Sequence, residues 1–185
     1  MEESLSFEAV SPLLRGRFGR ERYVYAEVTA STQRLLGPDD PEGAVAATEE
    51  QTEGRGRLGR EWHAPRGSSV LCSVLLRPGL PVERWPELSL VAGGAVAEAV
   101  RAAGVEPTLK HPNDVLAGGR KLAGMLAEAR DGIVVLGIGV NVRQQENELP
   151  DGATSLRLER STVSRPELLA EILAVLEAAY DCWNA

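Results

Sequence analysis

Short apolar runs bounded by turn residues set out the predicted strands of this chain. Runs rich in β-branched and aromatic residues are typical of strands, and a continuous apolar run between turn signals is typical of a buried strand. A glycine pair marks a tight hairpin turn, because glycine accepts a positive φ without strain. The pattern predicts strands over residues 23–28, 44–48, 69–76, 107–110, 123–129 and 132–142, and a hairpin over 115–122 that turns at Gly118-Gly119.

Two long helices are predicted from their termination and capping signals. Residues 88–103 are rich in Ala, Val and Leu and stop at Gly104, a common residue just past a helix C-terminus. Ser164 and Glu167 have the spacing of a capping box, in which each side chain bonds the other residue's backbone N–H. The second helix should therefore run from this box to about residue 179.

Shorter elements complete the order of the chain. Residues 31–36 predict a short helix capped by Ser31 or Thr32, and residues 1–22 predict a short helix or an irregular lead-in. Strands and helices then alternate irregularly, and hairpins join neighbouring strands. This order favours an α+β fold with a mixed, mainly antiparallel sheet packed against helices over a doubly wound parallel sheet.

The composition is that of one globular domain. The chain has 185 residues, of which 43% are hydrophobic and 25% charged, a size that one core can serve. No apolar run approaches the roughly 18–20 residues that span a membrane, and the acidic start lacks the order of a signal peptide. We therefore predict a single domain over residues 1–185, no membrane association and a cytoplasmic location.

Net charge narrows the class of partner. A formal charge of −7 argues against general nucleic-acid binding, because such binding needs a basic surface to neutralise phosphates. Cys72 and Cys182 lie far apart and in no metal-binding or redox spacing, so we interpret them as reduced thiols and assign them no chemistry. Against this acidic background, any basic cluster is informative.

One basic cluster is the loop Gly54-Arg55-Gly56-Arg57-Leu58-Gly59-Arg60. Its glycines let the backbone approach a ligand closely, and its arginines carry forked donors suited to phosphate and carboxylate oxygens. The spacing is neither that of a Walker A loop nor that of the dinucleotide fingerprint. The alternative is a solvated Arg/Gly surface loop of the kind found in RNA-binding segments. Trp62, just beyond the loop, could stack on a purine or could belong to the core.

The second cluster contains both lysines of the chain. Lys110 opens the segment Lys110-His111-Pro112-Asn113-Asp114, and Lys121 follows across the predicted hairpin. A chain that otherwise uses arginine, and places both lysines here, indicates a need for a compact charge on a flexible stem, as at a phosphate. Asp114 is a candidate Mg²⁺ ligand, and His111 receives no acid-base role.

A third pattern is Gly137-Ile138-Gly139-Val140-Asn141, which ends an apolar strand with two glycines and an amide. Glycine in a strand admits a flat ligand or another backbone, and it also occurs in a bulged core strand. The segment Ser31-Thr32-Gln33 and Gln51 are weak signals by themselves, since capping explains a serine or threonine there.

Taken in order, these segments resemble the biotin protein ligase family. The resemblance rests on five blocks: Ser31-Thr32-Gln33, Gln51 to Trp62, Lys110 to Asp114, Lys121 to Glu128 and Gly137 to Asn141. It implies the fold of the catalytic domain of biotin and lipoate ligases, which is similar to class II aminoacyl-tRNA synthetases. It also implies a two-step reaction. The biotin carboxylate attacks the α-phosphate of ATP to give biotinyl-5′-AMP and pyrophosphate, and a lysine of a biotin carboxyl carrier domain then takes the acyl group.

The resemblance also implies roles for individual residues. Catalysis would fall to Lys121, Arg57 and Lys110. Biotin would contact Ser31, Thr32, Gln33, Gln51, Gly54, Arg55, Gly56, Arg57 and Lys121. The nucleotide would contact Arg57, Arg60, Trp62, Lys110, Asn113, Asp114 and Asn141. ATP and biotin would be substrates, with Mg²⁺ as cofactor and Asp114 as its candidate ligand. The partner would be the acceptor domain and not DNA, and the resemblance also includes a homodimer among the expected assemblies.

The sequence departs from the family pattern at a few places. His111 stands where tryptophan is common, Gln33 where asparagine is common, and Leu58 where many members carry arginine. We expect neither the N-terminal DNA-binding domain of the regulatory members nor the small C-terminal β-barrel. Three alternatives stay open: a lipoate or octanoate ligase or transferase, a catalytically silent biotin- or nucleotide-binding module, and an RNA-binding protein.

Overall fold

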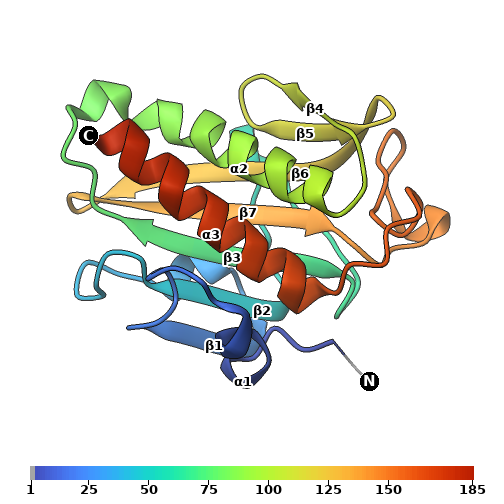
Figure 1. Ribbon diagram of the computed structural model, residues 1–185, viewed down its shortest axis with the longest axis horizontal. Helices are drawn as coiled ribbons and strands as arrows, with labels where there is room; N and C mark the ends of the chain where they lie inside the picture. Colours follow the sequence, from blue (N-terminus) through green and yellow to red (C-terminus); the bar gives the residue numbers. More distant parts are fainter. Residues whose placement is uncertain (1–2) are drawn as a thin grey trace.

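The computed structural model describes residues 3–185 and contains a seven-stranded sheet (Figure 1). The strands follow the order β1-β2-β3-β7-β6-β5-β4 across the sheet, with β1 parallel to β2 and every other neighbouring pair antiparallel. This confirms the predicted mixed, mainly antiparallel sheet. The strands are β1 Tyr23–Thr29, β2 Val45–Gln51, β3 Ser69–Leu76, β4 Pro107–Lys110, β5 Asp114–Ala117, β6 Arg120–Arg130 and β7 Ile133–Asn141.

Two long helices pack side by side over one face of the sheet (Figure 1). The α-helices are α1 Phe7–Val10, α2 Leu88–Ala102 and α3 Arg165–Asn184, and the 3₁₀ turns are η1 Ser11–Leu13, η2 Thr32–Arg34, η3 Arg57–Gly59, η4 Val82–Glu87 and η5 Glu146–Glu148. Within residues 3–185, no helix is both long enough and apolar enough to cross a membrane.

Most predicted elements agree with the structure within a few residues. The capping box at Ser164 and Glu167 is present, and the hairpin turns at Gly118-Gly119, where both glycines have positive φ. Two helix predictions were wrong in length. Helix α3 continues to Asn184, because no glycine or proline stops it near residue 179. The helix predicted over 31–36 is only the 3₁₀ turn η2, although Ser31 caps it as expected.

The two faces of the sheet have different tasks. In β3, Val70, Cys72 and Val74 belong to the main core shared with α2 and α3. Successive strand residues point to opposite faces, so the alternate residues point away from those helices. Among them, Ser73 lies 2.7 Å from the Thr32 hydroxyl. In β7, an added Cβ at Gly137 would meet the side chain of Gln33. The face away from α2 and α3 therefore carries the polar residues singled out in the sequence.

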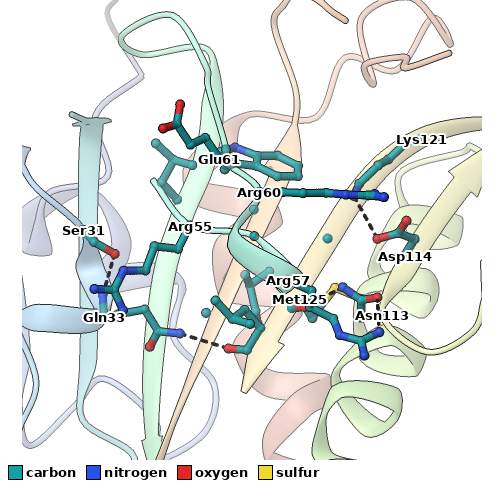
Figure 2. A pocket seen from close by; sticks show the side chains of 18 of the residues that line it. Ser31, Gln33, Arg55, Arg57, Arg60, Glu61, Asn113, Asp114, Lys121 and Met125 are labelled. Atoms are coloured by element: carbon teal, nitrogen blue, oxygen red, sulfur yellow. Dashed lines mark hydrogen bonds and ion pairs between the residues drawn. The ribbon is translucent and has the colours of Figure 1, made fainter. Parts of the chain in front are cut away.

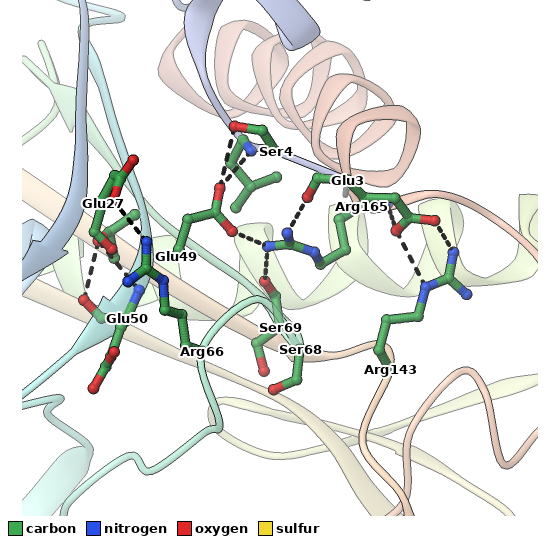
Figure 3. A network of polar contacts seen from close by, with 12 residues as sticks. Glu3, Ser4, Glu27, Glu49, Glu50, Arg66, Ser68, Ser69, Arg143 and Arg165 are labelled. Atoms are coloured by element: carbon green, nitrogen blue, oxygen red, sulfur yellow. Dashed lines mark hydrogen bonds and ion pairs between the residues drawn. The ribbon is translucent and has the colours of Figure 1, made fainter. Parts of the chain in front are cut away.

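A buried ion pair ties β2 to the start of α3 (Figure 3). The Arg165 guanidinium lies 2.7 Å from the Glu49 carboxylate, and the two side chains are only 2% and 8% exposed. Arg165 also donates to the Ser69 carbonyl, while Glu49 accepts from the Leu5 backbone N–H and the Tyr25 hydroxyl. Further hydrogen bonds stabilise a buried charge pair, and this network supplies several of them, while the Arg165 Nε has no partner among the described residues. It holds the N-terminal segment, β2 and α3 together.

Candidate functional site

A cavity of about 270 Å³ lies on the sheet face away from α2 and α3 (Figure 2). Segments far apart in the sequence meet there: the turn η2, the end of β2, the loop from Gly54 to Arg60 (the Gly/Arg loop), the β4–β5 turn, and strands β6 and β7. The predicted site residues that line it are Ser31, Thr32, Gln33, Gln51, Arg55, Gly56, Arg57, Arg60, Trp62, Lys110, Asn113, Asp114 and Lys121. The structure thus brings together nearly all the residues nominated from the sequence.

One end of the cavity is a buried set of hydrogen-bonding groups. The Gln51 side-chain oxygen accepts from the Thr32 backbone N–H at 2.8 Å and from the Thr32 hydroxyl at 3.2 Å. Gln33 is 3% exposed and donates through Nε2 to the Leu126 carbonyl at 3.0 Å. Its Oε1 is buried and has no hydrogen-bond partner among the described residues. This end therefore has an unused acceptor as well as fixed amides.

The Gly/Arg loop forms a small hairpin over the cavity. The Gly56 N–H donates to the Arg60 carbonyl at 2.7 Å, and the Trp62 N–H donates to the Gly54 carbonyl at 2.9 Å. A Cβ on Gly54 would lie 2.3 Å from the Trp62 carbonyl oxygen, so only glycine fits there. Gly54 shapes the loop and does not itself line the cavity. At the tip, Leu58 has φ 57° and is 89% exposed.

The loop arginines supply a cationic wall. Arg55 forms an ion pair with Glu128 at 3.1 Å, which fastens the loop to β6. Arg57 donates to the Asn113 side-chain oxygen at 3.3 Å, which joins the loop to the β4–β5 turn. Arg60 lines the same cavity. In a protein of net charge −7, this wall concentrates positive charge where an anionic ligand would sit.

Trp62 packs on the glycines of β6 and β7. A Cβ added at Gly139 would lie 2.8 Å from the indole ring, and one at Gly124 would lie 3.2 Å from it. The glycines of the Gly137 to Asn141 segment thus admit two side chains of this chain, Gln33 and Trp62, and not a second backbone. The indole Nε1 of Trp62 is buried with no partner among the described residues.

Both lysines line the cavity, Lys110 from the end of β4 and Lys121 from β6. The Lys121 ammonium lies 2.9 Å from the Asp114 carboxylate and 5.7 Å from the centre of the Trp62 ring. Asn113 fixes the turn, because its side chain donates to the Met125 carbonyl at 3.0 Å and its own carbonyl accepts from the Met125 N–H. The peptide bond between His111 and Pro112 is cis.

Asn141 lies outside the cavity lining. It is 5% exposed, donates to the Thr154 carbonyl at 3.0 Å and accepts from the Gln144 side chain at 3.0 Å. Its predicted nucleotide contact stays a prediction. Sequence reasoning missed Ser73, whose hydroxyl meets that of Thr32. It also gave no role to Glu128, although this residue closes the quoted Lys121 to Glu128 block.

Metal-binding groups are sparse. Residues 3–185 contain no group of three or more His, Cys, Asp or Glu side chains placed to hold a metal ion. The candidate ligand Asp114 is paired with Lys121. The arrangement is therefore no dedicated protein cage for a divalent cation.

The chain is similar to biotin ligases in sequence. It is 37% identical over 175 residues to the bifunctional ligase/repressor BirA of Bacillus subtilis, covering 86% of this chain and 54% of the relative. It is 43% identical over 157 residues to the biotin–acetyl-CoA-carboxylase ligase of Mycobacterium tuberculosis, covering 82% of this chain and 59% of the relative. The chain therefore spans little more than half the length of these curated relatives.

Its structure is similar as well. The biotin protein ligase from Aquifex aeolicus in complex with biotin and ATP superposes with a TM-score of 0.77 at 31% identity, over 89% of this chain and 72% of that one. This confirms the fold expected from the resemblance. A family model described as the biotin/lipoate A/B protein ligase family matches residues 25–145, which contain every predicted site residue. The chain belongs to the biotin/lipoate A/B protein ligase family.

Proposed function

We propose that this chain is a biotin protein ligase. It would activate biotin with ATP to form biotinyl-5′-AMP and pyrophosphate, and then transfer biotin to a lysine of a biotin carboxyl carrier domain. One observation carries the proposal: a single cavity joins a buried end of fixed amides and hydroxyls to a mouth lined by five cationic side chains. Those side chains are Arg55, Arg57, Arg60, Lys110 and Lys121.

The buried end favours biotin over lipoate or octanoate. Thr32, Gln33 and Gln51 offer both donors and acceptors, and the Gln33 Oε1 is unpaired. A buried polar group left without a partner costs about 1–3 kcal/mol, so a dithiolane ring or an alkyl chain would be disfavoured there. The ureido ring of biotin carries two N–H donors and a carbonyl acceptor, which complement such a set.

The cationic mouth suits the first step. A carboxylate oxygen of biotin would bond to the α-phosphorus of ATP while the bond to pyrophosphate breaks, and negative charge accumulates on the phosphate oxygens. Fixed cations aimed at such charge stabilise the transition state. Lys121 would serve the carboxylate and α-phosphate, Lys110 the triphosphate, and Arg57 the phosphate of the adenylate. No nucleophilic side chain is needed, since orientation and charge do the work.

Magnesium fits this cavity as an ion carried mainly by the nucleotide. Mg²⁺ keeps several waters and is usually held by substrate phosphates with one or two carboxylates. Asp114 is the first residue of β5 and lies beside Lys121, so its carboxylate would hold the hydrated ion against the phosphates. When bound, Mg²⁺ would neutralise part of the triphosphate charge.

The second step would join the activated acyl group to the acceptor. The acceptor amine would attack the acyl carbon and lose a proton to solvent as a C–N bond forms, and AMP would leave with the electrons of the broken C–O bond. Arg55 and Arg57 belong to the loop that would cover the intermediate. The single-domain organisation, the cytoplasmic location and a homodimer remain predictions.

The test separates the rival functions. Protein would be incubated with ATP, Mg²⁺ and either biotin, lipoate or octanoate, and pyrophosphate release would be measured. A purified biotin carboxyl carrier domain would then be added and protein-bound biotin detected by blotting. Of the three acids, we expect only biotin to give pyrophosphate release, and we expect biotin to be transferred to the carrier domain. Release with lipoate or octanoate would identify the other branch of the family, and biotin binding without release would indicate a silent binding module.

A further inference from the structure

The peptide group of Lys121 is held by a segment that lies far away in the sequence. The ladder between β6 and β7 begins at Ala123 and Val140, so Lys121 extends beyond the end of β7. There its N–H donates to the Gly152 carbonyl at 2.8 Å, and its carbonyl accepts from the Thr154 N–H at 2.8 Å. An isolated parallel bridge between Lys121 and Ala153 results. Both backbone polar groups of the lysine are therefore fixed by residues 152–154.

Thr154 is the centre of this attachment. It is fully buried, and each of its polar groups has a partner. Besides its N–H bond to Lys121, its carbonyl accepts from the Asn141 side chain at 3.0 Å, and its hydroxyl donates to Glu159 at 2.6 Å. The same Glu159 oxygen accepts from Arg120 at 3.0 Å. Glu159 thus connects Thr154 to the residue directly before Lys121.

The other end of Lys121 depends on this backbone position. Its ammonium reaches the cavity between the Asp114 carboxylate and the Trp62 ring. A long lysine side chain has many rotamers, so a precise charge position requires a fixed starting point. Misplacing a charged group by about 1 Å can lower a reaction rate by up to roughly 100-fold.

We propose that Glu159 is a positioning residue that holds Lys121 at the cavity through Thr154 and Arg120. It lines no part of the cavity itself. Its effect on rate rests on the proposed function, because Lys121 must act on the reacting groups. The effect of Glu159 on the geometry of Lys121 does not rest on the proposed function, and it can be measured without any substrate.

The chain offers an unusual direct measurement, because it has only two lysines. Labelling with ¹⁵N-lysine gives two backbone amide signals, and the Lys110→Arg variant assigns them. In Glu159→Ala we expect the Lys121 amide to exchange with solvent at least about fivefold faster, as follows when a hydrogen bond that anchors its partner segment is lost. Unchanged exchange of this amide in a folded Glu159→Ala protein would overturn the proposal.

Glu146 provides a matched control. It also pairs with Arg120, at 3.4 Å, but its side chain is 73% exposed. Glu146→Ala removes the same charge beside the same arginine, and should leave the exchange rate unchanged. Thr154→Val removes the hydroxyl at constant shape and should reproduce Glu159→Ala. Glu159→Gln keeps an oxygen that can accept from Thr154 and should restore most of the protection. Equal effects in Glu146→Ala and Glu159→Ala would reduce the role to surface charge and contradict the proposal.

The activity arm uses biotin-dependent pyrophosphate release. For Glu159→Ala we expect kcat to fall about 10- to 100-fold. The KM for biotin should stay within about twofold, because η2 and β2 hold the buried end independently of Glu159. A raised KM with an unchanged kcat would contradict positioning through Lys121. If even the unaltered chain releases no pyrophosphate, the proposed function fails, while the amide exchange still decides whether Glu159 holds Lys121.

Discussion

The Lys121 ammonium and the Asp114 carboxylate face each other at 2.9 Å across the β5–β6 hairpin. The pair lies at the cationic mouth of the cavity, where the Lys121 ammonium is also 5.7 Å from the centre of the Trp62 ring. An ion pair of partly exposed groups contributes little to folding stability, typically below about 1 kcal/mol. We therefore infer that the Lys121 ammonium can leave Asp114 and bind an anionic substrate. This inference leads to the first prediction.

Replacing Lys121 by alanine should abolish adenylate formation while leaving the fold intact. Loss of one charge that is aimed at the transition state lowers turnover by at least about 100-fold. The measurement is biotin-dependent pyrophosphate release in a single turnover. Arg101→Ala is the control, since it removes a cation from an exposed pair with Glu106 on the helix α2 side. Near-normal release by Lys121→Ala would show that another group stabilises the charge.

Replacing Arg57 by glycine should loosen retention of the adenylate more than its formation. Arg57 connects the loop to Asn113 of the β4–β5 turn, so its loss removes both a charge and a loop attachment. We expect the intermediate to escape into solution several-fold faster. Release is measured by separating free from bound biotinyl-5′-AMP after a chase. An unchanged escape rate would show that Arg57 does not retain the adenylate, and that other residues hold the loop closed.

Replacing Gly139 by alanine should damage the site by displacing Trp62. The new Cβ would lie 2.8 Å from the indole ring, and overpacking of this kind costs about 1–3 kcal/mol. Gly94→Ala is the matched control, because no heavy atom other than those of its chain neighbours and its own helix backbone lies within 4 Å of its added Cβ in the middle of α2. There alanine should stabilise the helix by roughly 0.5–1 kcal/mol. Urea unfolding of both variants gives opposite signs if the contact with Trp62 is as described.

Cys72 should be protected from thiol reagents in the folded protein, whereas Cys182 should react. Burial raises the pKa of the Cys72 thiol from 9.0 to about 12, and Cys182 is exposed. Only the thiolate is reactive, so at pH 8 we expect one thiol to react rapidly and the other only on unfolding. A reaction of both thiols at equal rates under native conditions would contradict the burial of Cys72.

The raised pKa of Cys72 also makes the stability of the protein depend on pH. The folded state binds the Cys72 proton more tightly than the unfolded chain does. The protonated thiol therefore makes its full contribution to the free energy of unfolding below pH 9, and this contribution is lost as the pH rises toward 12. The free energy of unfolding should fall across this interval. In Cys72→Ala the fall should be smaller, which urea titrations at several pH values would measure.

Much of the site was predictable from the sequence because its functional groups lie close together along the chain. The Gly/Arg loop and the Lys110 to Asp114 turn each concentrate their functional groups within a few residues, and their chemistry does not depend on knowing the fold. The strands were predictable for the same reason, since an apolar run such as Ser69–Leu76 is itself the local signal.

The rest depends on contacts between distant segments. Nothing near Gly139 in the sequence indicates that the Trp62 ring occupies its face, so the sequence predicted a flat ligand, another backbone or a bulged core strand there and not this side chain. Nothing near Lys121 indicates that Thr154 holds its backbone. The pairing of Glu49 with Arg165 also needs the sheet and α3 to be assembled first. A local pattern of hydrophobic and polar residues cannot predict a partner that lies far away in the sequence.

The Glu49 and Arg165 pair has a consequence for how this domain can be divided or fused. If the chain were split between β7 and α3, each piece would carry one member of a pair that is stable only when both are buried together. Leaving either charge alone in the interior costs about 3–5 kcal/mol, a large part of a domain's total stability. The two pieces should therefore reassemble as a matched pair and stay inactive apart, which suits a split reporter. A tag joined to the N-terminus would need to leave Leu5 free to reach Glu49.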